Sequence, residues 1–281
     1  MKKKIAIVLD SACGIQTFRD FNKNEDIHFV PLIISTPDGK NYNDDETLTV
    51  SEFETLLAKN PKLFTAQSTP GVVINLWTKL LEEYDEVVCL PISSGLSGQY
   101  QTMKMLSKDF NGKVHVVSTN GISFALHYVA KWAQQLIDEG LSGKEIAERL
   151  DKECESIRGY IVVQDLKRLV AGGRITPAVA LLAKLLKICP ILKWNGKIDK
   201  FDKARTWKKA VISTIEQLKS EGVKKVDFGS SLTNKDAEKF IMSELKDAGI
   251  EVGMSVYIAF VLSAHIGLDT FAFMPDLKET I

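Results

Sequence analysis

Short apolar runs that end in polar or glycine-rich turns, each followed by a helical pattern, recur through the first half of the chain. Apolar strands are expected at residues 27–34, 87–90 and 113–117, and helical spacing of apolar residues predicts helices at 49–59 and 123–138. Strands that alternate with helices in this way bury both of their faces when helices cover a parallel sheet. The sequence therefore predicts an α/β fold with a doubly wound, mostly parallel sheet in the first half.

The second half of the chain has a less regular pattern. A short strand is expected at 159–163, and the dipeptide at 195–196, Asn-Gly, predicts a β-hairpin. We therefore expect two domains, an N-terminal α/β domain over residues 1–157 and a second domain over residues 158–281.

The charges on the chain are balanced, with 36 Lys and Arg residues and 36 Asp and Glu residues. A formal net charge of zero argues against a nucleic-acid-binding protein that relies on a broad basic field. The four cysteines are widely spaced and form no C-x-x-C motif, which favours reduced thiols and a cytoplasmic location. The longest apolar stretches are interrupted by lysine well before about eighteen residues, so we expect no membrane span.

Small hydroxyl residues and glycines follow the strand at 87–90, where an α/β sheet usually binds its ligands. Ser93 and Ser94 offer hydroxyl groups, and a helix is expected to open near Leu96, where free backbone amides favour an anion. Two interpretations stay open at this point. The serines only cap the helix, or they bind an anion or a carboxylate.

A second hydroxyl-rich loop spans residues 64–71 and includes Thr65. Late in the chain, His265 lies among small residues in an expected turn at 263–267 that follows a strand. A structural and a functional role for this histidine are both open.

Arg174 follows two glycines, Gly172 and Gly173, in an expected loop. Its guanidinium could reach an acidic group or a partner, the alternative being a solvated arginine. Nucleophile-elbow, phosphate-loop, dinucleotide and zinc-protease motifs are all missing from the sequence. The four histidines have no metal-ligand spacing, so we expect no metal.

The motifs also occur in a characteristic order, which is Asp10-Ser11, Pro31 to Ile34, Asp38 to Tyr42, Thr65 to Gly71, Ser93 to Tyr100, Leu169 to Ile175, Arg205 to Ala210 and His265 to Gly267. Taken together, this order resembles the DegV family of bacterial fatty-acid-binding proteins over essentially the full chain. The resemblance implies two α/β domains, a mixed sheet in the second, and a lipid slot between them. The fatty-acid carboxylate would be bound by Thr65, Ser93, Ser94 and His265.

The resemblance also implies a role for the chain as the lipid-carrying subunit of bacterial fatty acid kinase. A separate ATP-dependent kinase protein would phosphorylate the presented carboxylate for phospholipid synthesis, so the chain itself would not be an enzyme and would carry no cofactor. Contact with the membrane would be transient, without stable insertion. The candidates for contact with the head group or the partner are Arg174, Gly172, Gly173 and Arg205.

The chain departs from the usual family residues at Ala66, at Ser68 and after Gly267, so lipid binding follows from the resemblance more directly than kinase coupling. Burial of a saturated tail contributes about 0.8 kcal/mol per methylene, so we expect the tail to supply affinity and the hydroxyl groups to supply orientation. Residues 177–187 and 256–262 are the expected apolar walls of the slot.

Two other functions fit the same residues. One is a serine hydrolase in which Ser94 acts with His265 and an acid such as Asp10, although the usual elbow motif is missing. The other is an α/β module that binds a small sugar.

Overall fold

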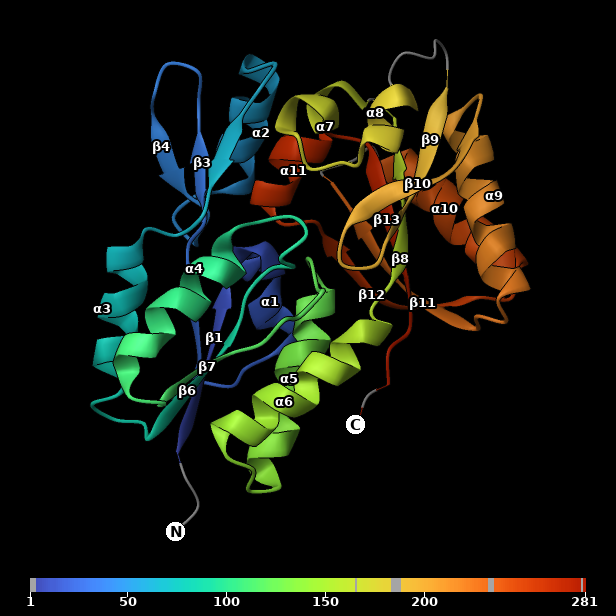
Figure 1. Ribbon diagram of the computed structural model, residues 1–281. Coiled ribbons are helices and arrows are strands. Elements are labelled where there is room, and N and C mark those ends of the chain that lie inside the picture. The colour runs from blue at the N-terminus through green and yellow to red at the C-terminus, as the bar shows by residue number, and fades with distance from the viewer. Residues whose placement is uncertain (1–3, 165, 183–187, 232–234, 279) are drawn as a thin grey trace.

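The computed structural model describes residues 4–164, 166–182, 188–231, 235–278 and 280–281. They form a four-stranded sheet, a six-stranded sheet and a small three-stranded sheet, with helices between and around them (Figure 1). The helices of the first half are α1 (Ile15–Phe21), α2 (Val50–Lys59), α3 (Pro70–Leu80), α4 (Gln99–Leu106), α5 (Ala125–Asp138) and α6 (Gly143–Glu153). Those of the second half are α7 (Leu166–Gly172), α8 (Pro177–Leu182), α9 (Trp207–Ser220), α10 (Lys235–Asp247) and α11 (Phe260–Ile266).

The four-stranded sheet is entirely parallel. Its strands lie in the order β2 (Ile27–Val30), β1 (Ile5–Asp10), β6 (Glu86–Leu90) and β7 (Val114–Val116). Buried side chains of α3 and α4 pack on one face, and those of α5 and α6 pack on the other. This is the doubly wound arrangement that the strand and helix pattern predicts.

A small antiparallel sheet stands above the carboxyl end of the parallel sheet (Figure 1). Its strands lie in the order β4 (Asn41–Asn43), β3 (Ile33–Ser35) and β5 (Phe64–Ala66). Helix α2 packs with it and begins at a capping box, in which Thr49 and Glu52 bond to each other's backbone amides.

The six-stranded sheet is mixed. Its strands lie in the order β10 (Ile198–Ala204), β9 (Cys189–Trp194), β8 (Gly159–Val163), β13 (Thr270–Pro275), β11 (Lys225–Ser230) and β12 (Glu251–Tyr257). Strands β11 and β12 are parallel to each other, and the other neighbours are antiparallel. Helices α9 and α10 cover one face, while the other face turns toward the first half of the molecule.

The α/β fold with a parallel and a mixed sheet is confirmed, and so is the hairpin at Asn195 and Gly196, which joins β9 to β10. Residues 1–157 supply the strands of the parallel and the small sheet, and β8 begins the mixed sheet just after them. The division into two domains at this point stays a prediction.

Three local predictions are wrong. Residues 27–34 are not one strand, because Pro31 interrupts the ladder and the chain crosses from β2 into β3 of a different sheet. The turn expected at 263–267 is the last part of helix α11, whose apolar side chains are buried between the two halves of the molecule. Helix α4 begins at Gln99 and not near Leu96.

Candidate functional site

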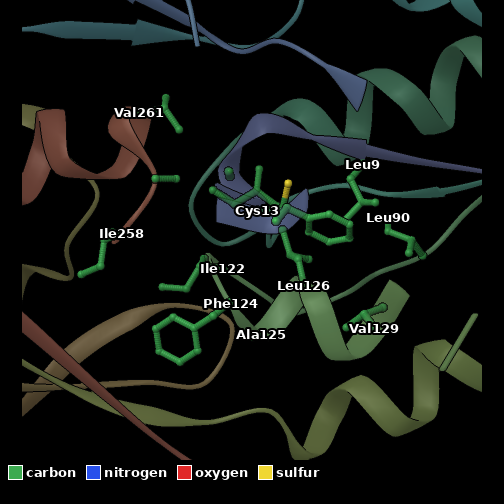
Figure 2. Packing of buried hydrophobic residues seen from close by; sticks show 14 of the residues in the cluster. Leu9, Cys13, Leu90, Ile122, Phe124, Ala125, Leu126, Val129, Ile258 and Val261 are labelled. Carbon is green, nitrogen blue, oxygen red and sulfur yellow. The ribbon is translucent and has the colours of Figure 1, made fainter. Parts of the chain in front are cut away.

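An apolar cavity lies between the mixed sheet and the first half of the chain. The first half contributes Leu32, Thr65, Ala66, Gln67, Ile92, Leu96, Ser97, Ile122, Ser123 and Phe124. The second half contributes Ile161, Leu169, Arg174, Trp194, Ile198, Ile258, Val261, Leu262, His265, Ile266 and Ala272. Figure 2 shows Ile122 and Phe124, which follow β7, facing Ile258 and Val261 of the second half.

The side-chain alternation of the mixed sheet decides which residues reach this cavity. In β13, Phe271 and Phe273 point toward the core beneath α9 and α10. Ala272, between them, therefore faces the first half of the molecule and lines the cavity. Because the alanine side chain is small, it leaves open space on the cavity face of the sheet. The large phenylalanine side chains fill the core on the opposite face.

One end of the cavity is polar. Thr65 Oγ1 on β5 lies 2.7 Å from Nε2 of His265 on α11, although the two residues are 200 positions apart. The small sheet brings them together, because β5 packs against α11. Burial, together with the charge of Arg174, lowers the pKa of His265 to about 4, so the imidazole is neutral near pH 7.

The surroundings of His265 indicate which ring nitrogen carries the proton. Nδ1 is buried and has no hydrogen-bond partner among the described residues. A buried N–H without an acceptor is costly, so the proton belongs on Nε2, which then donates to Thr65 Oγ1. The hydroxyl hydrogen of Thr65 is then free to be donated to a ligand oxygen. A neutral histidine therefore orients Thr65 as a donor toward the cavity.

The serine turn places its hydroxyl groups in three different environments. Ser93 is buried, donates to the carbonyl oxygen of Gly196, and does not line the cavity. Ser94 is exposed and does not line the cavity either. The amides of Leu96 and Ser97 both bond to the carbonyl of Ser93, and this turn brings Ser97 to the cavity wall.

Ser97, Gln67 and Ser123 are therefore the polar lining residues that reasoning from the sequence missed. Ser97 and Gln67 lie inside the two motifs that the sequence singles out, so the motif signal was present for these two. Of the three serines in the turn, Ser97 faces the cavity, while the predicted residues Ser93 and Ser94 do not line it. Ser68, one of the unusual residues, is buried and donates to the carbonyl of Pro31, which gives it a structural role.

Gly172 and Arg174 both lie beside His265. An added Cβ on Gly172 would lie 2.2 Å from Nδ1 of His265, so the ring packs directly on the glycine backbone. Arg174 lines the cavity and its Nη1 donates to the carbonyl of Gly172 at 2.6 Å. Gly173 takes the left-handed conformation, with φ at 66°, after the end of α7. Arg205 is exposed beyond β10 and lines no part of the cavity.

A surface vestibule adjoins the cavity. Leu96, Arg174 and Ile198 line both spaces, which makes this vestibule the mouth of the cavity. The vestibule also contains Lys197, so two cationic side chains stand at the entrance. An acidic head group at the mouth would be attracted to them.

The two expected apolar walls have different outcomes. From residues 256–262, Ile258, Val261 and Leu262 line the cavity. From the other segment, residues 177–181 of α8 do not line it, while residues 183–187 lie outside the described residues.

A hydrolase triad is not assembled here. Among the described residues, Ser94, His265 and Asp10 make no hydrogen bond with one another. Asp10 is fully buried and accepts the backbone N–H groups of Ala12 and Ile92. The nucleophile and base of a serine hydrolase lie within hydrogen-bond reach of each other, which this arrangement does not provide.

Within the part of the chain that the structure describes, no cluster of three or more His, Cys, Asp or Glu side chains is placed to hold a metal ion. The described helices are each too short or too polar to span a bilayer.

The comparisons with known proteins agree with this geometry. Residues 4–276 match the family model described as "Uncharacterised protein, DegV family". The chain belongs to the DegV family. Among curated DegV domain-containing proteins, one from Mycoplasmopsis pulmonis is 34% identical over 76% of this chain and 74% of its own length. One from Staphylococcus aureus (strain N315) is 32% identical over 79% of this chain and 77% of its own length. The resemblance found in the sequence is confirmed.

Solved structures of DegV proteins have the same fold. A fatty-acid-binding DegV protein from Thermus thermophilus is 28% identical, with a TM-score of 0.82 over 96% of this chain and 98% of its own. A fatty-acid-binding DegV protein from Streptococcus agalactiae is 26% identical, with a TM-score of 0.84 over 98% of this chain and 100% of its own. DegV from Bacillus subtilis, a fatty acid binding protein, is 27% identical, with a TM-score of 0.80 over 97% of this chain and 98% of its own.

Proposed function

We propose that this DegV protein binds a long-chain fatty acid, with the tail in the cavity and the carboxylate at its polar end. The observation that carries the proposal is the Thr65–His265 pair, which gives a largely apolar cavity a polar end. Thr65 and Ser97 would donate hydrogen bonds to the carboxylate, and Arg174 would supply the positive charge, since His265 is neutral near pH 7. Ser97 takes the role that the sequence suggests for Ser93 and Ser94.

The energetics fit a tail that supplies most of the affinity. About fourteen buried methylenes contribute roughly 11 kcal/mol before costs. Association and ordering cost an estimated 4–15 kcal/mol, so tight binding needs a preformed slot. Each hydrogen bond to the charged carboxylate adds about 1.5–3 kcal/mol, which fixes the head group at the polar end.

The position of the head group suits presentation to a partner. At the mouth, a carboxylate oxygen could attack the γ-phosphorus of ATP held by a separate kinase protein, with ADP as leaving group and an acyl phosphate as product. Arg174 reaches from the cavity into the vestibule, so we assign it to the head group during this transfer. Gly172, Gly173 and Arg205 remain candidates for the partner contact.

Native mass spectrometry of the protein purified from bacteria tests lipid binding. We expect an added mass equal to a long-chain fatty acid, which organic extraction removes. An empty protein that also fails to take up palmitate would contradict the proposal, and a bound sugar would favour the alternative module. Adding a bacterial fatty acid kinase protein and ATP to the loaded form should yield acyl phosphate, detected as its hydroxamate.

Exchange of single serines separates two roles within the serine turn. We expect Ser97→Ala to weaken palmitate binding by about tenfold or more, because one hydrogen bond to the carboxylate is lost. Ser93→Ala is the matched control. It should leave the affinity nearly unchanged and lower the free energy of unfolding by about 1 kcal/mol, because the carbonyl of Gly196 loses its donor. Titration calorimetry measures the affinities and urea unfolding measures the stabilities. If Ser93→Ala weakened binding and Ser97→Ala did not, Ser93 and not Ser97 would bind the carboxylate.

A further inference from the structure

The lining residues show the path of the cavity across the mixed sheet. Ile198 on β10 and Trp194 on β9 line one part, then Ile161 on β8 and Ala272 on β13. Because these strands are successive neighbours, the cavity runs mainly across the strands, with an offset of two residues between Trp194 and Ile161. Ile198 also lines the vestibule, so the path starts at the mouth, on the β10 side.

Phe124 lies at the opposite end of this path. Its side chain is 1% exposed and its ring stands against β11, the strand beyond β13, where an added Cβ on Gly229 would lie 2.5 Å from its Cε1. The same added Cβ would lie 3.2 Å from Ile258, which lines the cavity as well. Sheet backbone is therefore directly behind the ring.

The loop that carries Phe124 is also tied down. The backbone of Ser123 has φ at 48°, and its N–H donates to the carbonyl of Ala12 at 2.8 Å. Positive φ in a non-glycine residue persists where the surroundings fix the backbone. The position of the Phe124 ring is thus fixed by the hydrogen-bonded loop that carries it and by the backbone of β11 behind it.

We propose that Phe124 closes the far end of the slot and sets the length of the acyl chain that fits. This inference rests on the proposed function, because it takes the ligand to be a fatty acid. Neighbouring strands lie about 4.8 Å apart, so the four intervals from β10 to β11 span about 19 Å. An extended chain advances about 1.3 Å per carbon, given C–C bonds of about 1.5 Å, so about fifteen carbons fit.

The test compares affinities for the saturated acids laurate, myristate, palmitate, stearate and arachidate. For the wild-type protein we expect the tightest binding near palmitate. In Phe124→Ala the slot is extended, and each further methylene that it buries is worth about fourfold in affinity. The ratio of arachidate to palmitate affinity should therefore rise by about tenfold or more.

Gly229→Ala tests the same boundary in the other direction without removing a core side chain. Its added methyl group would push the Phe124 ring toward the slot, so the optimum should move to myristate or laurate. Leu96→Ala at the mouth is the matched control, and it should weaken all five acids by a similar factor without moving the optimum.

The outcomes separate the inference from the function on which it rests. If the wild-type protein binds these acids and the optimum stays at one chain length in both variants, Phe124 does not set the length. If Phe124→Ala fails to fold, Gly229→Ala decides by the same criterion. If the wild-type protein binds none of the acids, the proposed function itself is wrong and the inference falls with it.

Discussion

Gly172→Ala is expected to weaken fatty-acid binding by about tenfold to a hundredfold. The added methyl group would lie 2.2 Å from Nδ1 of His265, so the imidazole has to move. The ring then loses the 2.7 Å contact with Thr65, and the threonine hydroxyl is no longer oriented toward the carboxylate. One charge-assisted hydrogen bond is worth about 1.5–3 kcal/mol. Its loss therefore lowers the affinity by about tenfold to a hundredfold.

Gly173→Ala is the matched control in the neighbouring residue. Gly173 has φ at 66° and no atom within 4 Å of an added Cβ, so alanine meets backbone strain there without a clash. We expect a loss of about 1 kcal/mol in the free energy of unfolding and little change in affinity. Calorimetric titration with palmitate, paired with urea unfolding of each variant, distinguishes the two. Equal affinities of the two variants would show that His265 does not position the head group.

The parts of the fold that could be predicted from the sequence are those encoded by local patterns. Alternating strands and helices indicated the parallel sheet, and Asn195 with Gly196 indicated the β9–β10 hairpin. Helix α11 could not be read in the same way. Its residues are buried on most sides between the two halves, so no polar face marks them as helical. The start of the helix is fixed by a contact that is distant in sequence, because the N–H of Val261 donates to Asp44, 217 residues away.

The candidate site was predicted as a set of motifs but not as a geometry. The family resemblance brought Thr65 and His265 into one site, which no local pattern could do across 200 residues. The serine hydroxyl groups are placed differently from the expectation, because their positions depend on where α4 begins. A helix that opened at Leu96 would have put Ser93 and Ser94 at its amino end. With α4 starting at Gln99, the preceding turn buries Ser93 and brings Ser97 to the cavity.

Asp10 is expected to make the stability of this protein fall as the pH rises from about 4 to about 7. Burial raises the pKa of this carboxyl from 3.8 to about 7, and the N–H groups of Ile92 and Ala12 only partly offset the effect. The folded state therefore favours the protonated acid, whereas the unfolded chain ionises near the ordinary value. Between these two pKa values the unfolded state releases the proton and the folded state keeps it. Above pH 7, the ionised and buried Asp10 lowers the free energy of unfolding by about 4 kcal/mol relative to low pH.

Asp10→Asn removes this titration. Its NH₂ group cannot accept a hydrogen bond, whereas the hydroxyl oxygen of the protonated acid still accepts weakly. Ala12 or Ile92 therefore loses a partner, and the variant should be less stable at low pH by about 1–3 kcal/mol. When the pH rises from about 5 to about 8, however, the free energy of unfolding should fall by about 2–3 kcal/mol more in the wild-type protein than in the variant. His265 and His127, whose pKa values burial lowers, titrate equally in both proteins and cancel in this comparison.

Urea unfolding of both proteins at the two pH values measures this difference. Asp109→Asn, which removes an exposed carboxyl in the same way, is the control and should behave as the wild type does.

The result also bears on the site, because Asp10 binds the amide of Ile92, which lines the cavity at the start of the serine turn. A protonated Asp10 still accepts strongly at its carbonyl oxygen and weakly at its hydroxyl oxygen, and it avoids a buried charge beside Asp44. Parallel pH profiles for the wild type and Asp10→Asn would mean that Asp10 carries its charge inside the fold, and that the turn is supported by a carboxylate.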